Sequence, residues 1–154
     1  MKQFVPKILG LSTLFLFVAG FITAGDYGSQ KVAYHFNERD LRVTAMGLKN
    51  IQNHINAVGK DKLKVIAVFH GWGVLTLSNV SKNKNEQHIA EIIKKRVKKL
   101  KSQGVSFKIC KNTITGKKID FKKDLYDVKE NDIIPSGVAE LAKLQAEGYT
   151  YIKP

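Results

Sequence analysis

The sequence predicts a single-domain α/β fold of three layers, in which a mostly parallel central sheet is flanked by helices. Three times, a strand-like segment is followed by a helical pattern, a glycine and another strand-like segment, with the glycines at Gly59, Gly104 and Gly148. Residues 65–69 are continuously apolar, which is typical of a strand buried on both faces of a parallel sheet. With 154 residues, 44% of them hydrophobic, the chain is long enough to form one core.

The first 24 residues have the three regions of a secretory signal peptide. Lys2 and Lys7 form a basic start, residues 8–22 are almost all apolar, and small residues follow. The apolar run is shorter than the ~20 residues that a membrane-spanning helix needs. We expect a signal peptide over residues 1–24, a linker over 25–30 and the folded domain over 31–154, in a periplasmic or otherwise exported protein. A leader kept as an uncleaved anchor is the alternative, and membrane contact is expected only through it.

The first half of the domain is predicted to contain two strands and a helix. A strand over residues 31–36 is followed by polar residues that offer an N-cap. Apolar residues at spacings of three and four indicate an amphipathic helix over residues 41–58, which ends at Gly59. After the second strand, over residues 63–69, the run His70-Gly71-Trp72-Gly73 indicates a turn where the backbone comes close to another group.

The second half repeats the alternation. A polar loop precedes a lysine-rich amphipathic helix over residues 86–103, and the segment 104–112 contains a short strand that ends in a loop. A helix that begins at Gly137 has Ser136 as its expected N-cap. The remaining elements are expected to be a turn over 115–118, a short helix over 121–128, the helix over 137–147 and a final strand over 149–152.

The chain is strongly basic, with a formal net charge of +13. Such a charge favours acidic partners, although a solvated basic face that keeps the protein soluble gives the same pattern. The aromatic residues are not interleaved with the basic ones as in a platform for single-stranded nucleic acid. We therefore expect no nucleic-acid partner.

Cys110 is the only cysteine, so it cannot close a disulfide within the chain. It ends a strand, and in an open α/β sheet ligands gather outside the carboxyl ends of the strands. His35 lies at the end of the first predicted strand and His70 directly follows the second, so both would lie along the same edge. The alternatives are a structural Cys110 in the core and a His35 that belongs to the core or its rim.

Several neighbours of Cys110 could support a reactive thiolate. Lys108 lies two residues back on the same strand face, and Lys111 follows directly. These cations, or the N-terminus of a helix that begins near residue 112, would favour the ionised sulfur. The backbone of Gly71 and Gly73, together with His70, would shape the pocket.

Other chemistries find little support in the sequence. A dithiol motif, a dinucleotide fingerprint, a phosphate loop and a nucleophile elbow are all missing. Two histidines and a cysteine are also the ligands of some copper sites, but no methionine is placed as an axial ligand. We expect neither a cofactor nor a metal site.

Three segments together resemble the DsrE/DsrF-like family, specifically its exported branch. They are residues 64–69 leading into His70-Gly71, the run Gly104-Val105-Ser106-Phe107-Lys108-Ile109-Cys110-Lys111-Asn112-Thr113, and the long C-terminal run over residues 135–154. The resemblance implies a compact α/β fold that assembles into homo-oligomers such as trimers or hexamers. It also implies a link to sulfur metabolism, with the carrier cysteine of the cytoplasmic relatives at the position of Cys110.

We therefore expect an exported sulfur-handling protein that carries sulfur as a persulfide on Cys110 and exchanges it with a sulfur donor or acceptor protein. The alternative is a non-catalytic oligomeric module of the same fold that binds a small ligand or a metal. In that alternative, Cys110 is structural.

Overall fold

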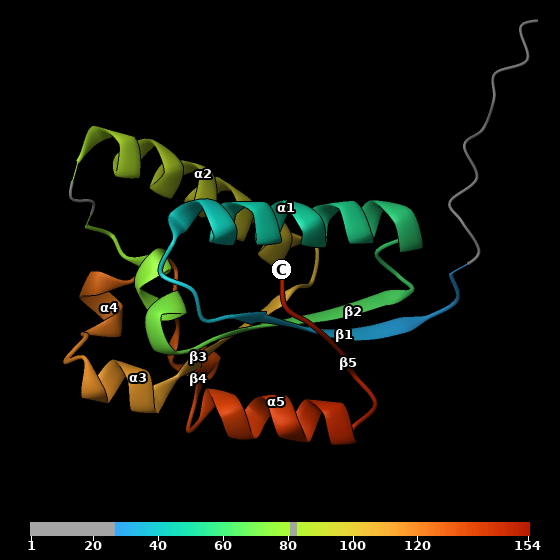
Figure 1. Ribbon diagram of the computed structural model, residues 1–154. Helices are drawn as coiled ribbons and strands as arrows, with labels where there is room; N and C mark the ends of the chain where they lie inside the picture. The colour runs from blue at the N-terminus through green and yellow to red at the C-terminus, as the bar shows by residue number, and fades with distance from the viewer. Residues whose placement is uncertain (1–26, 81–82) are drawn as a thin grey trace, which may run out of the picture.

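The computed structural model describes residues 27–80 and 83–154 (Figure 1). The predicted signal peptide and the first part of the linker lie outside these residues. Within them, no helix is both long enough and apolar enough to cross a membrane.

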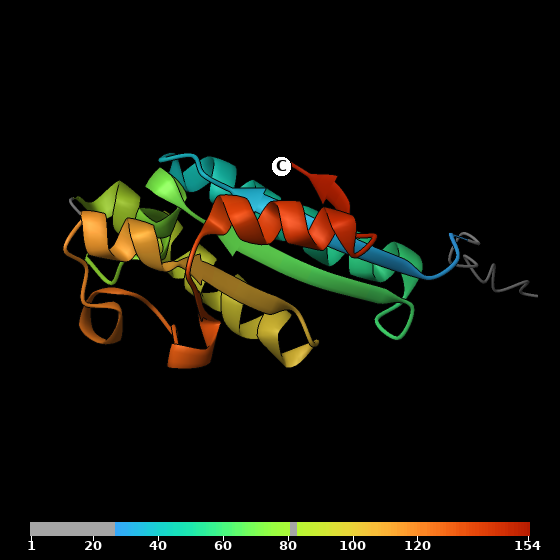
Figure 2. The same ribbon diagram turned by 90° about the horizontal axis from the view of Figure 1, so that it is seen from below.

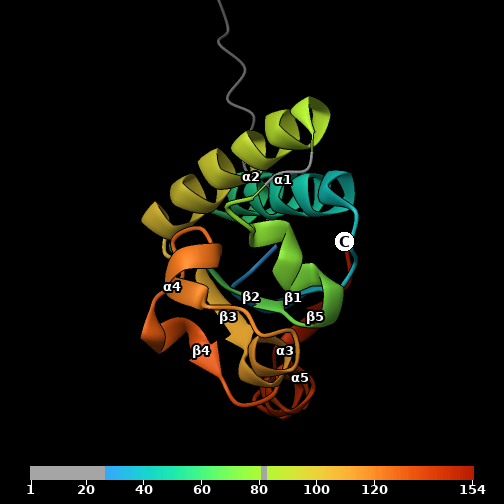
Figure 3. The ribbon, with the colours of Figure 1, turned by 90° about the vertical axis from the view of Figure 1, so that its left-hand side faces the viewer.

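The centre of the fold is a sheet of five parallel strands in the order β4-β3-β2-β1-β5 (Figures 1 and 3). The strands span β1 Gln30–Phe36, β2 Leu63–Phe69, β3 Ser106–Cys110, β4 Ile133–Ile134 and β5 Thr150–Ile152. The two longest strands, β1 and β2, pair in the middle over seven residues each. The expected α/β fold with a parallel sheet is confirmed.

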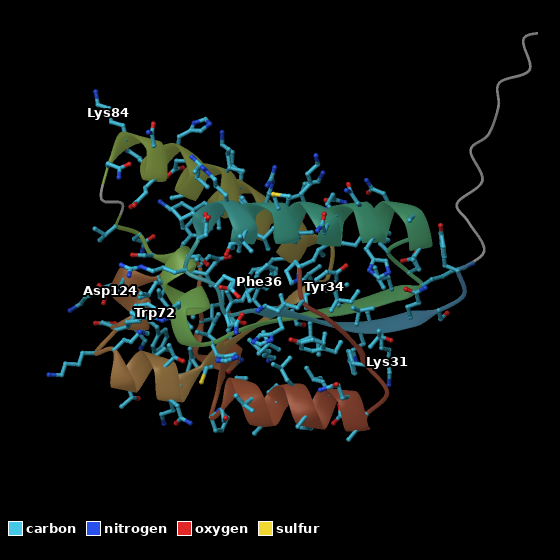
Figure 4. All side chains as sticks on the ribbon, in the orientation of Figure 1. Lys31, Tyr34, Phe36, Trp72, Lys84 and Asp124 are labelled. Carbon is cyan, nitrogen blue, oxygen red and sulfur yellow. The ribbon has the colours of Figure 1, made fainter. Side chains whose placement is uncertain are left out.

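Helices cover both faces of this sheet, which gives three layers (Figures 1 and 2). Helices α1 (Leu41–Val58) and α2 (Lys84–Ser102) lie on one face, and α5 (Gly137–Ala146) lies on the other. Side chains alternate along β1, so that Tyr34 and Phe36 point toward α1 whereas Lys31 points toward the α5 side (Figure 4). The expected N-caps are present, because Asp40 accepts from the N–H of Arg42 and Ser136 from that of Ala139.

The larger core lies between the sheet and the α1–α2 layer. At its centre, three phenylalanines from neighbouring strands stack, with ring centroids 4.5 Å apart for Phe36–Phe69 and 5.9 Å apart for Phe69–Phe107. Such aromatic pairs contribute about 0.5–1.5 kcal/mol each beyond the apolar area they bury. A smaller core on the other face joins the sheet to α5 through Leu141 and Leu144.

The chain continues in short helices after β2 and after β3. They are the 3-10 helices η1 (Gly71–Leu77) and η2 (Glu130–Asp132) and the α-helices α3 (Lys111–Gly116) and α4 (Phe121–Asp124). Lys111 begins α3 directly after β3, where we expected a loop. The helix predicted over residues 121–128 ends at Asp124, because Leu125 is extended and bridges to Ser78. Residues 133–134 form the unpredicted strand β4 beside β3.

The turn after β2 requires its glycines for two reasons. Gly71 has a φ of 56°, which favours glycine. A Cβ on Gly73 would lie 2.1 Å from the carbonyl oxygen of Phe36, so this position has no room for a side chain. Trp72 is 48% exposed and has two cations near its ring. The Nζ of Lys117 lies 3.5 Å and the Cζ of Arg39 5.0 Å from the ring centroid. The close backbone approach expected for this turn is confirmed.

Candidate functional site

Four polar side chains form a row across the α5 face of the sheet, near the carboxyl ends of the strands. Tyr151 comes from β5, His35 from β1, His70 directly follows β2, and Cys110 ends β3. The strand order makes these four strands consecutive neighbours. Parallel pairing and the alternation of side chains therefore bring together residues that are far apart in the sequence.

Strand register places His70 beside Cys110. The last aligned pair of β2 and β3 is Phe69 with Ile109, so the next pair along the chain is His70 with Cys110. His70 keeps an extended backbone, with φ −145° and ψ 173°, so the strand direction continues through it. Neighbouring strands lie about 4.8 Å apart, so the two residues are adjacent on one face.

The two histidines meet directly. The Nε2 atoms of His35 and His70 are 2.6 Å apart, and their rings are inclined by only 13°. The 4.6 Å between the ring centroids therefore reflects rings that meet edge to edge, because face-to-face rings could not bring their nitrogens this close. One Nε2 must donate and the other accept, so the protonation states of the two rings are coupled.

Tyr151 orients His35 from the other side. Its hydroxyl lies 2.7 Å from the Nδ1 of His35, so both ring nitrogens of His35 have a hydrogen-bond partner. Lys153, two residues further on, pairs with Glu38 at 2.7 Å and brings a cation and an anion close to the same ring.

Burial controls the charge of this pair. Desolvation lowers the pKa of His35 to about 4, with further lowering by His70 and Lys153 and a smaller opposing effect from Glu38. Desolvation also lowers the pKa of His70. Both imidazoles are therefore neutral at neutral pH, and each carries one proton.

The thiol of Cys110 lies among hydrogen-bond donors. Burial raises its pKa, but the backbone N–H groups of Gly137, Thr113 and Asn112 and the Thr113 hydroxyl lower it by more, and the net pKa is lowered. Cys110 stands at the N-cap of α3, and Gly137 is the first residue of α5. The starts of two helices therefore converge on the sulfur and favour the thiolate.

Thr113 connects the thiol to the turn after β2. Its Oγ1 accepts a hydrogen bond of 2.9 Å from the N–H of Gly71. The hydroxyl proton of Thr113 is then free to point toward Cys110, which agrees with the lowered pKa of the thiol. The backbone of Gly71 thus acts on the sulfur through Thr113.

Gly137 allows α5 to reach the site. A Cβ on this residue would lie 2.7 Å from the Cβ and 3.1 Å from the Cγ of His70. Only a glycine here allows the first N–H of α5 and the ring of His70 to lie together beside Cys110. Gly73, in contrast, packs against the backbone of Phe36 and supports the turn rather than the sulfur.

Lys108 and Lys111, which the sequence suggested as cations near the thiol, make other contacts. The Nζ of Lys108 donates to the backbone carbonyl of Asn131 at 3.1 Å. Lys111 is exposed at the first position of α3 and lines a cavity of about 380 Å³. The groups that lower the pKa of Cys110 are instead the N–H and hydroxyl donors described above.

That cavity lies next to the cysteine and is mainly apolar. Ile134, which pairs with Cys110 in the sheet, lines it together with Ile114, Phe121 and Pro135. Cys110 itself is only 5% exposed. Within residues 27–80 and 83–154, no group of three or more His, Cys, Asp or Glu side chains could hold a metal ion.

Sequence reasoning missed three contributors to this site: Thr113, Gly137 and Tyr151. Thr113 carried a weak signal, because a hydroxyl three residues after a strand-ending cysteine is well placed if a helix begins there. Gly137 and Tyr151 carried none, because their roles depend on the packing of α5 and on β5 lying beside β1.

Comparison with known proteins agrees with this architecture. A solved structure of a protein of unknown function, MTH1491 from Methanobacterium thermoautotrophicum, is 26% identical, with a TM-score of 0.66 over 82% of this chain and 100% of that one. The ychN protein from E. coli is 17% identical, with a TM-score of 0.50 over 81% of this chain and 99% of that one, and shares the fold. No curated protein matches the chain. The family model of the DsrE/DsrF-like family matches residues 22–154. The chain therefore belongs to the DsrE/DsrF-like family, whose members are generally linked to sulfur relay.

Proposed function

We propose that the protein is an exported sulfur carrier that holds a sulfur atom as a persulfide on Cys110. The observation that carries this proposal is the set of donors around the thiol, which lowers its pKa although the residue is buried. A thiolate is the form of cysteine that attacks sulfur. Membership of a family linked to sulfur relay supports the same chemistry.

The proposed reaction is an exchange of one sulfur atom. The Cys110 thiolate attacks the terminal sulfur of a donor persulfide, R–S–SH, and the S–S bond of the donor breaks. Its electron pair leaves on R–S⁻, and Cys110–S–SH remains on the protein. No net oxidation occurs. Because Cys110 is only 5% exposed, a terminal sulfur atom is the kind of group that could reach it.

Export and assembly are parts of the proposal that rest on the sequence and on the family. The leader over residues 1–24 supports a periplasmic or otherwise exported location. The family resemblance supports a homo-oligomer such as a trimer or hexamer, and a protein that donates or accepts the sulfur.

Mass spectrometry of the intact protein tests the carrier function. After incubation with a persulfide donor, Cys110 should gain the mass of one sulfur atom, and reduction with dithiothreitol should remove it. A Cys110→Ser variant should gain nothing. Native wild-type protein that stays unmodified with several donors, while its thiol still reacts with iodoacetamide, would contradict the proposal.

The burial of Cys110 favours one competing function, a binding module in which the cysteine is structural. The apolar cavity beside Cys110 is then the expected ligand site. A Cys110→Ser variant that is less stable but binds a small apolar probe as tightly as the wild type would support this alternative. A variant of unchanged stability that has lost sulfur uptake would support the carrier.

A further inference from the structure

We propose that Tyr151, His35 and His70 form a proton relay between the solvent and the thiol of Cys110. The proposal rests on the carrier function above, because sulfur transfer requires the thiol to lose a proton and the leaving group to gain one. In this proposal, Tyr151 exchanges protons with the solvent, and the two histidines pass them to and from the thiol.

The hydrogen bonds from Tyr151 to His70 are continuous, and strand register places Cys110 beside His70. The Tyr151 hydroxyl is 2.7 Å from the Nδ1 of His35, and the Nε2 of His35 is 2.6 Å from the Nε2 of His70. The edge-to-edge rings direct their nitrogen atoms at each other, which is the geometry for moving a proton between them.

The two ends of the relay lie where a proton must enter and leave. Tyr151 is 40% exposed on β5, which forms one edge of the sheet. His70 occupies the register position beside Cys110, and its ring packs on Gly137, whose N–H acts on the sulfur. Because the Nε2 of His70 bonds to His35, the relay assigns the proton exchange with the thiol to the Nδ1 of His70.

The surroundings disfavour a charged imidazole in the middle. The titratable and charged groups that act on His35 are His70 and Lys153, which disfavour its charged form, and Glu38, which favours it more weakly. Desolvation has the largest effect and keeps the ring neutral. A proton can therefore pass through the pair by a change of tautomers, but neither ring stores it.

The protons balance along the row. The thiol gives its proton to the Nδ1 of His70, and the Nε2 proton of His70 passes to the Nε2 of His35. The Nδ1 proton of His35 passes to the oxygen of Tyr151, and the hydroxyl proton of Tyr151 passes to water. The thiol loses one proton, water gains one, and both rings stay neutral. The reverse sequence delivers a proton to R–S⁻ after the S–S bond of the donor breaks.

The first experiment needs no sulfur donor. Histidine side-chain NMR follows His35 and His70 in the wild type and in Tyr151→Phe while the pH is raised through the ionisation of Cys110. We expect both rings to respond at that ionisation, and the response of His35 to change in Tyr151→Phe. His54, which bonds to Tyr34 and Gln30 in a separate cluster, should not respond. Rings that ignore the ionisation of Cys110 would overturn the relay, whatever the protein does with sulfur.

The second experiment measures the rate of persulfide formation against pH. His35→Gln retains a polar side chain that cannot switch tautomers, and Tyr151→Phe removes the outer link. General acid–base catalysis contributes about 10²–10⁴-fold, so each variant should slow uptake at least about tenfold where Cys110 is protonated. The deficit should vanish at a pH where the thiolate is already formed. His54→Gln is the matched control and should keep the wild-type rate.

The outcomes separate the two proposals. Wild-type protein that takes up no sulfur would overturn the carrier function, and the NMR experiment then decides the relay alone. Wild-type uptake with unchanged rates in His35→Gln and Tyr151→Phe at low pH would overturn the relay and leave the carrier standing. A uniform loss at all pH values would indicate a structural role for the row and would also overturn the relay.

Discussion

Replacement of Thr113 by valine tests whether a side-chain hydroxyl lowers the pKa of the Cys110 thiol. Valine keeps the branched shape of threonine but removes the hydroxyl that acts on the sulfur and accepts from Gly71. A hydrogen bond to a charged group contributes about 1.5–3 kcal/mol, and sulfur is a weak acceptor, so we take the lower end. One pKa unit corresponds to about 1.4 kcal/mol, so the thiol pKa should rise by about one unit.

The assay is the rate of alkylation by iodoacetamide as a function of pH, followed by mass spectrometry. Below its pKa, the Thr113→Val thiol should react about tenfold more slowly than the wild type, since a one-unit rise leaves a tenth of the thiolate. Thr113→Ser keeps the hydroxyl and should restore the rate. Thr115→Val, at an exposed position of the same helix, controls for the loss of a threonine from α3. A thiol pKa that is equal in Thr113→Val and Thr115→Val would refute the assignment of Thr113 as a donor.

Three further predictions follow from the packing and the charges. Gly73→Ala should destabilise the fold by about 1–3 kcal/mol or more, because its Cβ would meet the Phe36 backbone, whereas Gly116→Ala, which faces open space, should not; urea unfolding measures both. The pKa of His35 is about 4 in the folded state and higher in the unfolded state, so the unfolded state binds a proton at a higher pH. As the pH falls from 7 to 4.5, His35 should therefore lower the free energy of unfolding by about 2–3 kcal/mol. Urea unfolding of His35→Gln should show a smaller fall, and an equal fall would contradict this origin. Lys108→Gln should leave the alkylation profile of Cys110 unchanged, because Lys108 bonds to the Asn131 carbonyl; a raised thiol pKa would show that its charge matters after all.

Much of the fold could be predicted because local patterns and tertiary structure agree. The stripe over residues 41–58 is one face of a helix that is buried at Leu48 and Ile51, and Gly59 ends it with a φ of 93°. The continuous apolar run of β2 indeed lies in the middle of a parallel sheet. Strand β4 could not be predicted in the same way, because two residues have no period and only their pairing with β3 defines them.

The candidate site was predictable only in outline. The rule that strand ends share an edge placed His35, His70 and Cys110 near one another, and the register agrees. The groups that act on the thiol could not be ranked from the sequence. Lys108 is close along the chain but bonds elsewhere, whereas Gly137 is 27 positions away and its N–H reaches the sulfur. Spacing in the sequence indicates which residues share an element, and helix packing decides which atoms meet.

The placement of the polar row itself argues for a function. A face of a sheet that packs against a helix normally buries apolar side chains, and Ala33, Ile66 and Val68 do so further down the same strands. Toward the carboxyl ends, the same face instead holds the buried His35 and Cys110 and the partly buried His70, and desolvation lowers the pKa of both histidines. Buried polar groups lower stability unless they are fully paired, and aliphatic residues would pack here without that cost. Ionisable groups with shifted pKa values that gather at a strand edge are typical of sites that do chemistry. The row is therefore better explained by a reaction at Cys110 than by the needs of folding.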